Sequence, residues 1–167
     1  MSDADDNDRK PPNYDLLRRL REARRAFRYA LTQDGDARER MFSPANLLQT
    51  LRQHVDQTVI GTPRERCGRL FVLTVVLYSS LEWHFAGHSV NIEADVQMER
   101  IRQNYRYGGP EVDDRLTPKD WQTRMRGQIL RLEQELAVEE LYAARLIKLA
   151  ALAQAAVEAA FRHIESV

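Results

Sequence analysis

Apolar side chains recur at intervals of three and four residues along most of this chain, which is the spacing of one face of an α-helix. The first such segment begins at Tyr14, after a polar stretch. Its apolar positions are Leu16, Leu17, Leu20, Ala23, Phe27, Ala30 and Leu31. The segment 32–40 is expected to break this helix, with Gly35 as its terminator, because glycine favours helix ends.

A second helix is predicted to begin at Ser43-Pro44, with serine as N-cap and proline at the first helical position. Gly61 is expected to end it. The apolar positions that give this helix a buried side are Leu47, Leu48, Leu51 and Val55.

A third helix is predicted from the capping-box spacing of Thr62 and Glu65 to about Phe85. Its segment 70–78 is apolar on almost every side and rich in valine and aromatic residues, so a strand is the alternative. The cap signals and the length of the whole segment favour a central buried helix.

The fourth predicted helix covers residues 91–105, with Ile92, Val96, Ile101 and Tyr105 directed inward. The sequence Tyr-Gly-Gly-Pro at 107–110 must leave the helix, because glycine is unfavourable and proline is incompatible with a helix interior.

The fifth helix is predicted over 118–140, where Thr117 caps the start and Asp120 complements the positive helix N-terminus. Its apolar side consists of Trp121, Met125, Ile129, Leu132 and Leu136. An alanine-rich last helix follows over 142–167. Its small residues Ala143, Ala150, Ala153 and Ala160 would let another helix approach closely.

These patterns predict an all-α bundle of about six helices. Residues 1–13 are interpreted as a disordered polar tail, residues 14–88 as an N-terminal helical region, and residues 89–167 as a C-terminal helical region. A chain of 167 residues is long enough to bury a core without disulfides or metal ions.

Composition narrows the function classes. The 25 cationic side chains balance the 25 acidic ones, which argues against general nucleic-acid binding. Cys67 is the only cysteine, and the acidic start is unlike a signal peptide, so a cytoplasmic location is expected. The longest apolar run, 70–78, is too short to span a membrane.

Two features have a functional and an ordinary interpretation. His84 and His88 have the spacing of two metal ligands on a helix, but Gly87 lies between them and no cysteine joins them. Four arginines share one face of the first helix: Arg18, Arg21, Arg25 and Arg28. They could bind phosphates or an acidic partner, but a solvated amphipathic face is the more common situation.

The sequence contains no nucleophile elbow, phosphate-binding loop or dinucleotide fingerprint. Carboxylates remain, and they are dense around the Tyr-Gly-Gly-Pro turn: Glu93, Asp95, Glu99, Glu111, Asp113 and Asp114. Oxygen ligands suit Mg²⁺, so a metal site here is one hypothesis, and a solvated acidic turn is the other.

Three C-terminal segments share a pattern with a known family: "ERIRQNYRYGGPEVDD" (99–114), "LTPKDW" (116–121) and "RLIKLAALAQAAVEAA" (145–160). Over about residues 91–165 the chain resembles small phage and bacterial proteins related to the MazG-like nucleotide pyrophosphohydrolases. The resemblance implies an all-α bundle that dimerises or tetramerises. Active members hydrolyse nucleoside triphosphates to monophosphate and pyrophosphate, using magnesium held by a Glu-Glu-x-x-Glu set and a Glu-x-x-Asp set on consecutive helices.

This chain departs from that pattern. At the first set only Glu133 and Glu135 are acidic, and Arg145 and Lys148 occupy the second set. A cation there repels the metal, at a cost of about 1 to 4 kcal/mol for like charges roughly 4 Å apart. Two other sets of carboxylates could still bind magnesium. One is a shifted cluster of Glu133, Glu135, Glu139 and Glu140, and the other is a rebuilt metal site of Glu99, Asp113, Asp114 and Glu158.

The leading hypothesis is a catalytically degenerate MazG-like protein, a homo-oligomer that binds a nucleotide or a protein partner. The ligand-binding candidates are Tyr107, Asp113, Asp114, Arg145 and Lys148, and the catalytic candidates are Glu133, Glu135 and Glu158. The alternatives are an active Mg²⁺-dependent pyrophosphohydrolase and a non-enzymatic structural or host-interaction adaptor that works through the N-terminal helices.

Overall fold

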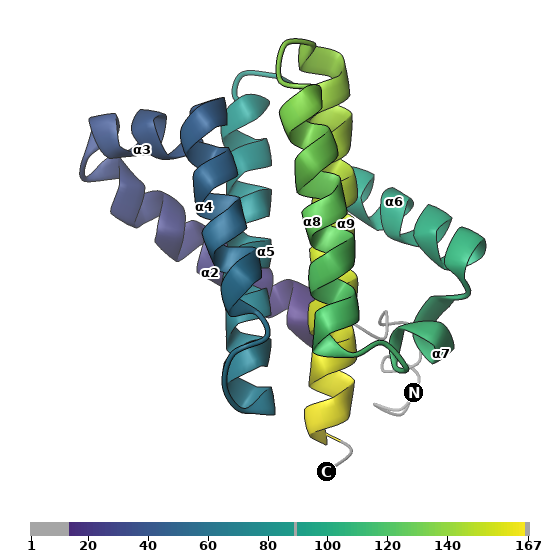
Figure 1. The fold of residues 1–167 in the computed structure, drawn as a ribbon. Helices are drawn as coiled ribbons and strands as arrows, with labels where there is room; N and C mark the ends of the chain where they lie inside the picture. Colours follow the sequence, from purple (N-terminus) through teal and green to yellow (C-terminus); the bar gives the residue numbers. More distant parts are fainter. Residues whose placement is uncertain (1–13, 89, 166–167) are drawn as a thin grey trace, which may run out of the picture.

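The computed structural model describes residues 14–88 and 90–165, which form helices and connecting turns without a strand (Figure 1). The predicted all-α class is therefore confirmed. The interpretation of residues 1–13 as a tail lies outside the described residues. The helices are α2 (Tyr14–Thr32), α3 (Gly35–Phe42), α4 (Pro44–Gln57), α5 (Pro63–His84), α6 (Ile92–Tyr107), α7 (Gly109–Asp113), α8 (Pro118–Gln134) and α9 (Glu139–Glu165).

Local sequence signals explain most of the helix starts. Thr62 accepts a hydrogen bond from the Glu65 backbone N–H at 3.2 Å and caps α5. Thr117 and Asp120 form a complete capping box at the start of α8. Ser43 holds the N-cap position of α4, but its hydroxyl makes no cap bond and donates instead to the Arg40 carbonyl at 3.2 Å.

Two sequence predictions about the helix boundaries are wrong, and one short helix was not predicted. Gly35 begins α3 and does not end the helix region, because Asp34 before it accepts from the Ala37 backbone N–H at 3.3 Å. The short helix α7 was not expected after the glycine turn. The fifth helix, α8, ends at Gln134, and a turn separates it from α9.

The core forms around α5, which is buried along most of its length between Leu70 and Leu81. The strand alternative for this segment is wrong. α5 packs along α9, where the small side chains of Ala150 and Ala153 are fully buried and permit close approach. The N-terminal and C-terminal regions contribute to one hydrophobic cluster, so the division at residue 89 divides the chain but not its core.

α6 departs most from its predicted packing. It lies against α9, and its C-terminal end stands away from the upright helices before α7 returns the chain to α8 (Figure 1). Val96 is buried as expected, but Ile101 and Tyr105 are 61% and 95% exposed. The inward side of α6 instead contains Glu99 and Arg100, because α9 presents polar groups to it.

Arginines of α2 form ion pairs with the neighbouring helices α5 and α6. Arg21 donates hydrogen bonds to both carboxylate oxygens of Glu93 of α6, and Arg28 lies 2.5 Å from Glu82 of α5. Arg24, on the same side of α2, pairs with Glu82 at 3.0 Å. Much of the arginine stripe is thus engaged within the molecule. No described helix has the length and apolar character of a membrane span.

Candidate functional site

A buried polar cluster joins α5, α6 and α9, and we call it the polar seam: Tyr78, Gln97, Arg100, Gln154 and Glu158. The Tyr78 hydroxyl donates to the Gln154 side-chain carbonyl, which also accepts from Gln97 at 3.1 Å. Burial raises the pKa of Tyr78 well above its usual range, so this hydroxyl stays a donor.

Glu158 ends the polar seam in a buried ion pair. Its carboxylate accepts from Arg100 Nη2 at 2.7 Å and from Gln154 Nε2 at 2.9 Å. The side chains of both charged partners are less than a tenth exposed. Glu158, a candidate for catalysis and for metal binding, is thus used to neutralise a buried arginine.

A cavity of about 380 Å³ opens between α6, α8 and α9, and we call it the cationic cavity. Three arginines line it: Arg100 from α6, and Arg124 and Arg131 from α8. The only acidic residue in its lining is Asp113. Glu158 neutralises Arg100, so the positive charge that this lining offers an anion comes from Arg124 and Arg131, with Asp113 opposing them.

Arg124 and Arg131 differ from the other arginines of this region. They are exposed at the cavity, and in the described part of the chain no carboxylate lies within 4.0 Å of either guanidinium. Gln128 lies between them on the same helix face and accepts from Arg145 at 2.9 Å. Tyr107, a predicted ligand-binding residue, also lines the cavity and is 55% exposed.

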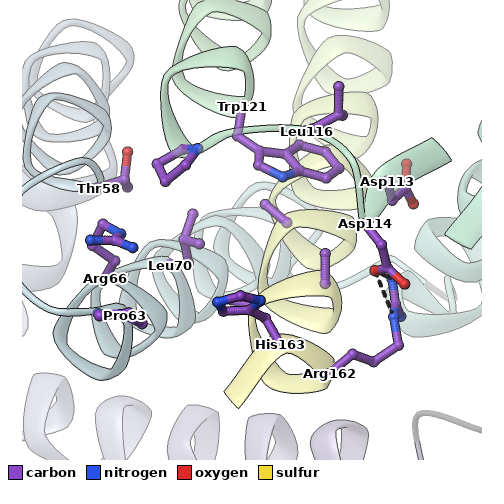
Figure 2. A pocket seen from close by; sticks show the side chains of 14 residues that line it. Thr58, Pro63, Arg66, Leu70, Asp113, Asp114, Leu116, Trp121, Arg162 and His163 are labelled. Atoms are coloured by element: carbon purple, nitrogen blue, oxygen red, sulfur yellow. Dashed lines mark hydrogen bonds and ion pairs between the residues drawn. The ribbon is translucent and has the colours of Figure 1, made fainter. Parts of the chain in front are cut away.

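A second cavity of about 400 Å³ lies between α5 and the lower ends of α8 and α9, and we call it the apolar cavity (Figure 2). Its apolar lining is Pro63, Leu70, Leu116, Pro118, Trp121, Ala156, Ala159 and Ala160. In Figure 2, Leu70 and Arg66 stand on one side, and Trp121 closes the top.

Asp113 lines both cavities, and so does Trp121. Asp113 is only 8% exposed, and its Oδ2 atom is buried without a hydrogen-bond partner among the described residues. Burial raises the pKa of this carboxyl, although the positive charges of Arg100 and Arg162 oppose the shift. A buried acceptor without a donor is costly and is one that a ligand could satisfy.

The glycine turn that sequence analysis singled out places this carboxylate. Gly108 and Gly109 have positive φ angles of 101° and 69°. A Cβ on Gly108 would meet Val112 at 2.6 Å, so no other residue fits there without a shift. The turn ends α6 and directs α7 back toward α9, which brings Asp113 between the two cavities.

The remaining predicted residues are largely paired. Asp114 lies at the apolar cavity but accepts from Arg162 at 2.9 Å (Figure 2). Glu133 lies 2.5 Å from Arg52 on the surface. Glu135 accepts two hydrogen bonds from Arg145, each 2.9 to 3.0 Å long, and these bonds hold the Glu135 pKa below its usual range.

Arg145 therefore forms an ion pair with Glu135, and it lies outside the lining of the cationic cavity. Lys148 is exposed, and the contact that involves it is a hydrogen bond from Gln103 to its backbone carbonyl at 3.2 Å. Neither residue is brought to a cavity with the other candidates.

The carboxylates do not fit a magnesium site. Glu99, Asp113, Asp114 and Glu158 were the proposed ligands, yet no group of three or more metal-binding side chains occurs among the described residues. Glu158 and Asp114 are each paired with an arginine, which competes with a cation for their oxygens. His84 contacts the rings of Phe85 and Tyr142, as an ordinary packed histidine does.

The arginines of the cationic cavity are not among the binding residues predicted from the sequence. Arg124, Gln128 and Arg131 have the spacing i, i+4 and i+7, which is one helix face, so this signal was present in the sequence. Arg100 could not be found in this way, because its burial depends on Glu158 from a distant segment. Comparisons of this chain with protein-family models, curated proteins and solved structures find no match.

Proposed function

We propose that this protein binds a nucleotide in the cationic cavity and holds its phosphates directly with arginines. The observation that carries the proposal is that Arg124 and Arg131 line one cavity and that, among the described residues, no carboxylate lies within 4.0 Å of either guanidinium. A guanidinium presents paired N–H donors that match phosphate oxygens, and it keeps its charge at any physiological pH.

Other groups at the same cavity suit the rest of a nucleotide. Gln103 and Asn104 supply side-chain amides, which can bond sugar hydroxyls. Tyr107 supplies a half-exposed aromatic ring on which a planar group can stack. A volume of about 380 Å³ is in the range of small-molecule sites.

We propose that the resemblance to MazG-like proteins reflects a common ancestor. In this proposal, the helical scaffold has lost the metal-binding carboxylates, with Arg145 and Lys148 at two of their positions. Binding then replaces hydrolysis. A cytoplasmic location, where nucleotides are abundant, is part of the same proposal.

Isothermal titration calorimetry of the full chain in EDTA tests binding. The ligands are ATP, GTP, CTP, UTP and inorganic tripolyphosphate, and the variant is the double substitution Arg124→Gln and Arg131→Gln. We expect the dissociation constant to rise by at least about tenfold, since each charge-assisted hydrogen bond contributes roughly 1.5 to 3 kcal/mol.

Arg126→Gln is the matched control, because Arg126 lies on the same helix but pairs with Asp56 at 2.7 Å, away from the cavity. Equal loss in the control and the double variant would contradict the proposal. Absence of binding by every ligand would favour the adaptor alternative.

Pyrophosphate release with and without Mg²⁺ tests the enzyme alternative. We expect no release above background, because the carboxylates do not assemble a metal site in the described residues. Turnover that a chelator abolishes would contradict the degenerate interpretation and make Glu133, Glu135 and Asp113 the residues to replace.

We also propose self-association through α6. Met98, Ile101 and Tyr105 form an exposed apolar stripe, with Asp95 near its start and Arg106 near its end. An antiparallel pair of α6 helices would bury both stripes and place Asp95 of one copy near Arg106 of the other. Sedimentation equilibrium should show a dimer that Ile101→Lys dissociates; an unchanged mass would contradict this pairing.

A further inference from the structure

Asp113 and Trp121 are the two residues that line both cavities. The two cavities are therefore adjacent. A ligand whose phosphates lie beside Arg124 and Arg131 has the apolar cavity next to it, on the other side of Asp113 and Trp121. The inference that follows rests on the proposed function, because it names the base of the nucleotide proposed there.

The apolar cavity suits a flat ring. Trp121, Leu116 and Pro118 form one part of its wall, and Ala156 and Ala159 of α9 form another, where the small side chains leave a smooth surface. Its volume of about 400 Å³ falls within the range of small-molecule sites. Apolar walls favour the faces of a purine or pyrimidine, and the edge of the ring then needs polar partners.

Two polar atoms at this cavity are buried without a hydrogen-bond partner among the described residues: Asp113 Oδ2 and Arg162 Nη2. Arg162 Nη2 still lies 2.8 Å from the Asp114 carboxylate, which leaves the Asp113 carboxylate, 8% exposed, as the group that a ligand could satisfy. An ionised carboxylate accepts hydrogen bonds at both oxygens and donates none. The ligand edge that best satisfies Asp113 therefore carries two neighbouring N–H donors.

Guanine is the common base with such an edge. Its ring N1–H and its 2-amino group point the same way, side by side. Adenine and cytosine place a ring-nitrogen acceptor next to their amino group, and uracil flanks its single N–H with two carbonyls. Each of these would direct a lone pair at a carboxylate oxygen, which is repulsive.

We propose that the protein selects guanine nucleotides, with the base in the apolar cavity donating two hydrogen bonds to Asp113 and the phosphates reaching Arg124 and Arg131. Discrimination of this kind is strong, because a wrong base leaves a buried carboxylate unpaired.

The test is calorimetric titration of the full chain at pH 7.5 in EDTA with GTP, ITP, XTP and ATP. ITP lacks the 2-amino group, and XTP has a carbonyl in its place. We expect GTP to bind at least tenfold more tightly than the other three. In Asp113→Asn, the side-chain amide can donate to the xanthine carbonyl, so the preference between GTP and XTP should reverse.

Glu111→Gln is the matched control and should keep the GTP preference, since Glu111 lies on the same short helix α7 but is exposed and lines neither cavity. If the Asp113 variant does not fold, the four nucleotides on the unchanged protein still decide the question. Equal affinity for all four would overturn the guanine inference and leave phosphate binding intact. Failure of tripolyphosphate and every nucleotide to bind would overturn the proposed function and this inference together.

Discussion

Two buried carboxylates, Glu158 and Asp113, lie near each other in this fold and have opposite surroundings. Glu158, in the polar seam, accepts from both Arg100 and Gln154. Asp113, after the glycine turn, is buried to the same extent, but one of its oxygens has no donor in the part of the chain that the structure describes. The Glu158 carboxylate has its hydrogen-bond donors within the protein, so we assign Glu158 to stability. One oxygen of the Asp113 carboxylate lacks a donor among the described residues, so we assign Asp113 to ligand binding.

The largest effect is expected from Glu158→Ala. This change leaves Arg100 buried without its counter-charge, so the free energy of unfolding should fall by about 3 to 5 kcal/mol. Urea denaturation followed by circular dichroism measures it. Glu133→Ala is the matched control: its partner Arg52 is half exposed, so the loss should stay below about 1 kcal/mol. Similar losses in both variants would contradict a special role for the polar seam.

A smaller effect is expected from Tyr78→Phe. The change removes the hydroxyl that donates to Gln154, but Gln97 still donates to the same oxygen. The expected loss is therefore about 1 kcal/mol, the usual contribution of one hydrogen bond. A loss as large as that of Glu158→Ala would mean that the seam acts as one cooperative unit.

The smallest effect on stability is expected from Asp113→Asn, with the free energy of unfolding unchanged or slightly increased at pH 7. Burial raises the pKa of Asp113 above its usual value of 3.8. Because the unfolded chain then gives up this proton first, the contribution of Asp113 to stability is present below pH 3.8 and is lost as the pH rises through the folded-state pKa.

Urea denaturation from pH 3 to pH 7 checks that prediction. The difference between Asp113→Asn and the unchanged protein should be smallest at pH 3 and should favour the variant at pH 7. A clear destabilisation at pH 7 would mean that Asp113 has a structural partner, and it would remove the contrast with Glu158.

The helices were predictable where short-range signals and burial agree. Thr62 and Thr117 cap α5 and α8 as expected, and the apolar segment of α5 is the centre of the core. Gly35 was misjudged because a glycine is compatible with either end of a helix, and Asp34 decides between them by capping α3. Ile101 and Tyr105 were misjudged because an apolar period does not reveal what the facing helix presents.

The candidate site was predictable only in part. The glycine turn drew attention to Asp113 from the sequence alone, since the turn residues are local. The different surroundings of Asp113 and Asp114 were not predictable, because Arg162, which donates a hydrogen bond to Asp114, lies 48 residues away. The sequence likewise made Glu158 a catalytic and metal-binding candidate, because its ion-pair partner Arg100 lies far away in the chain.

The sequence by itself determined the all-α class, the start of most helices and the turn that carries Asp113, because caps, periodicity and glycine conformations act within a few residues. The tertiary structure decided which charges cancel and which remain available. Arg145 forms an ion pair with Glu135, whereas no described carboxylate lies within 4.0 Å of the Arg124 guanidinium, although the two arginines are on neighbouring helices. Pairing depends on distances between segments remote in the chain, and those distances exist only once the core has formed.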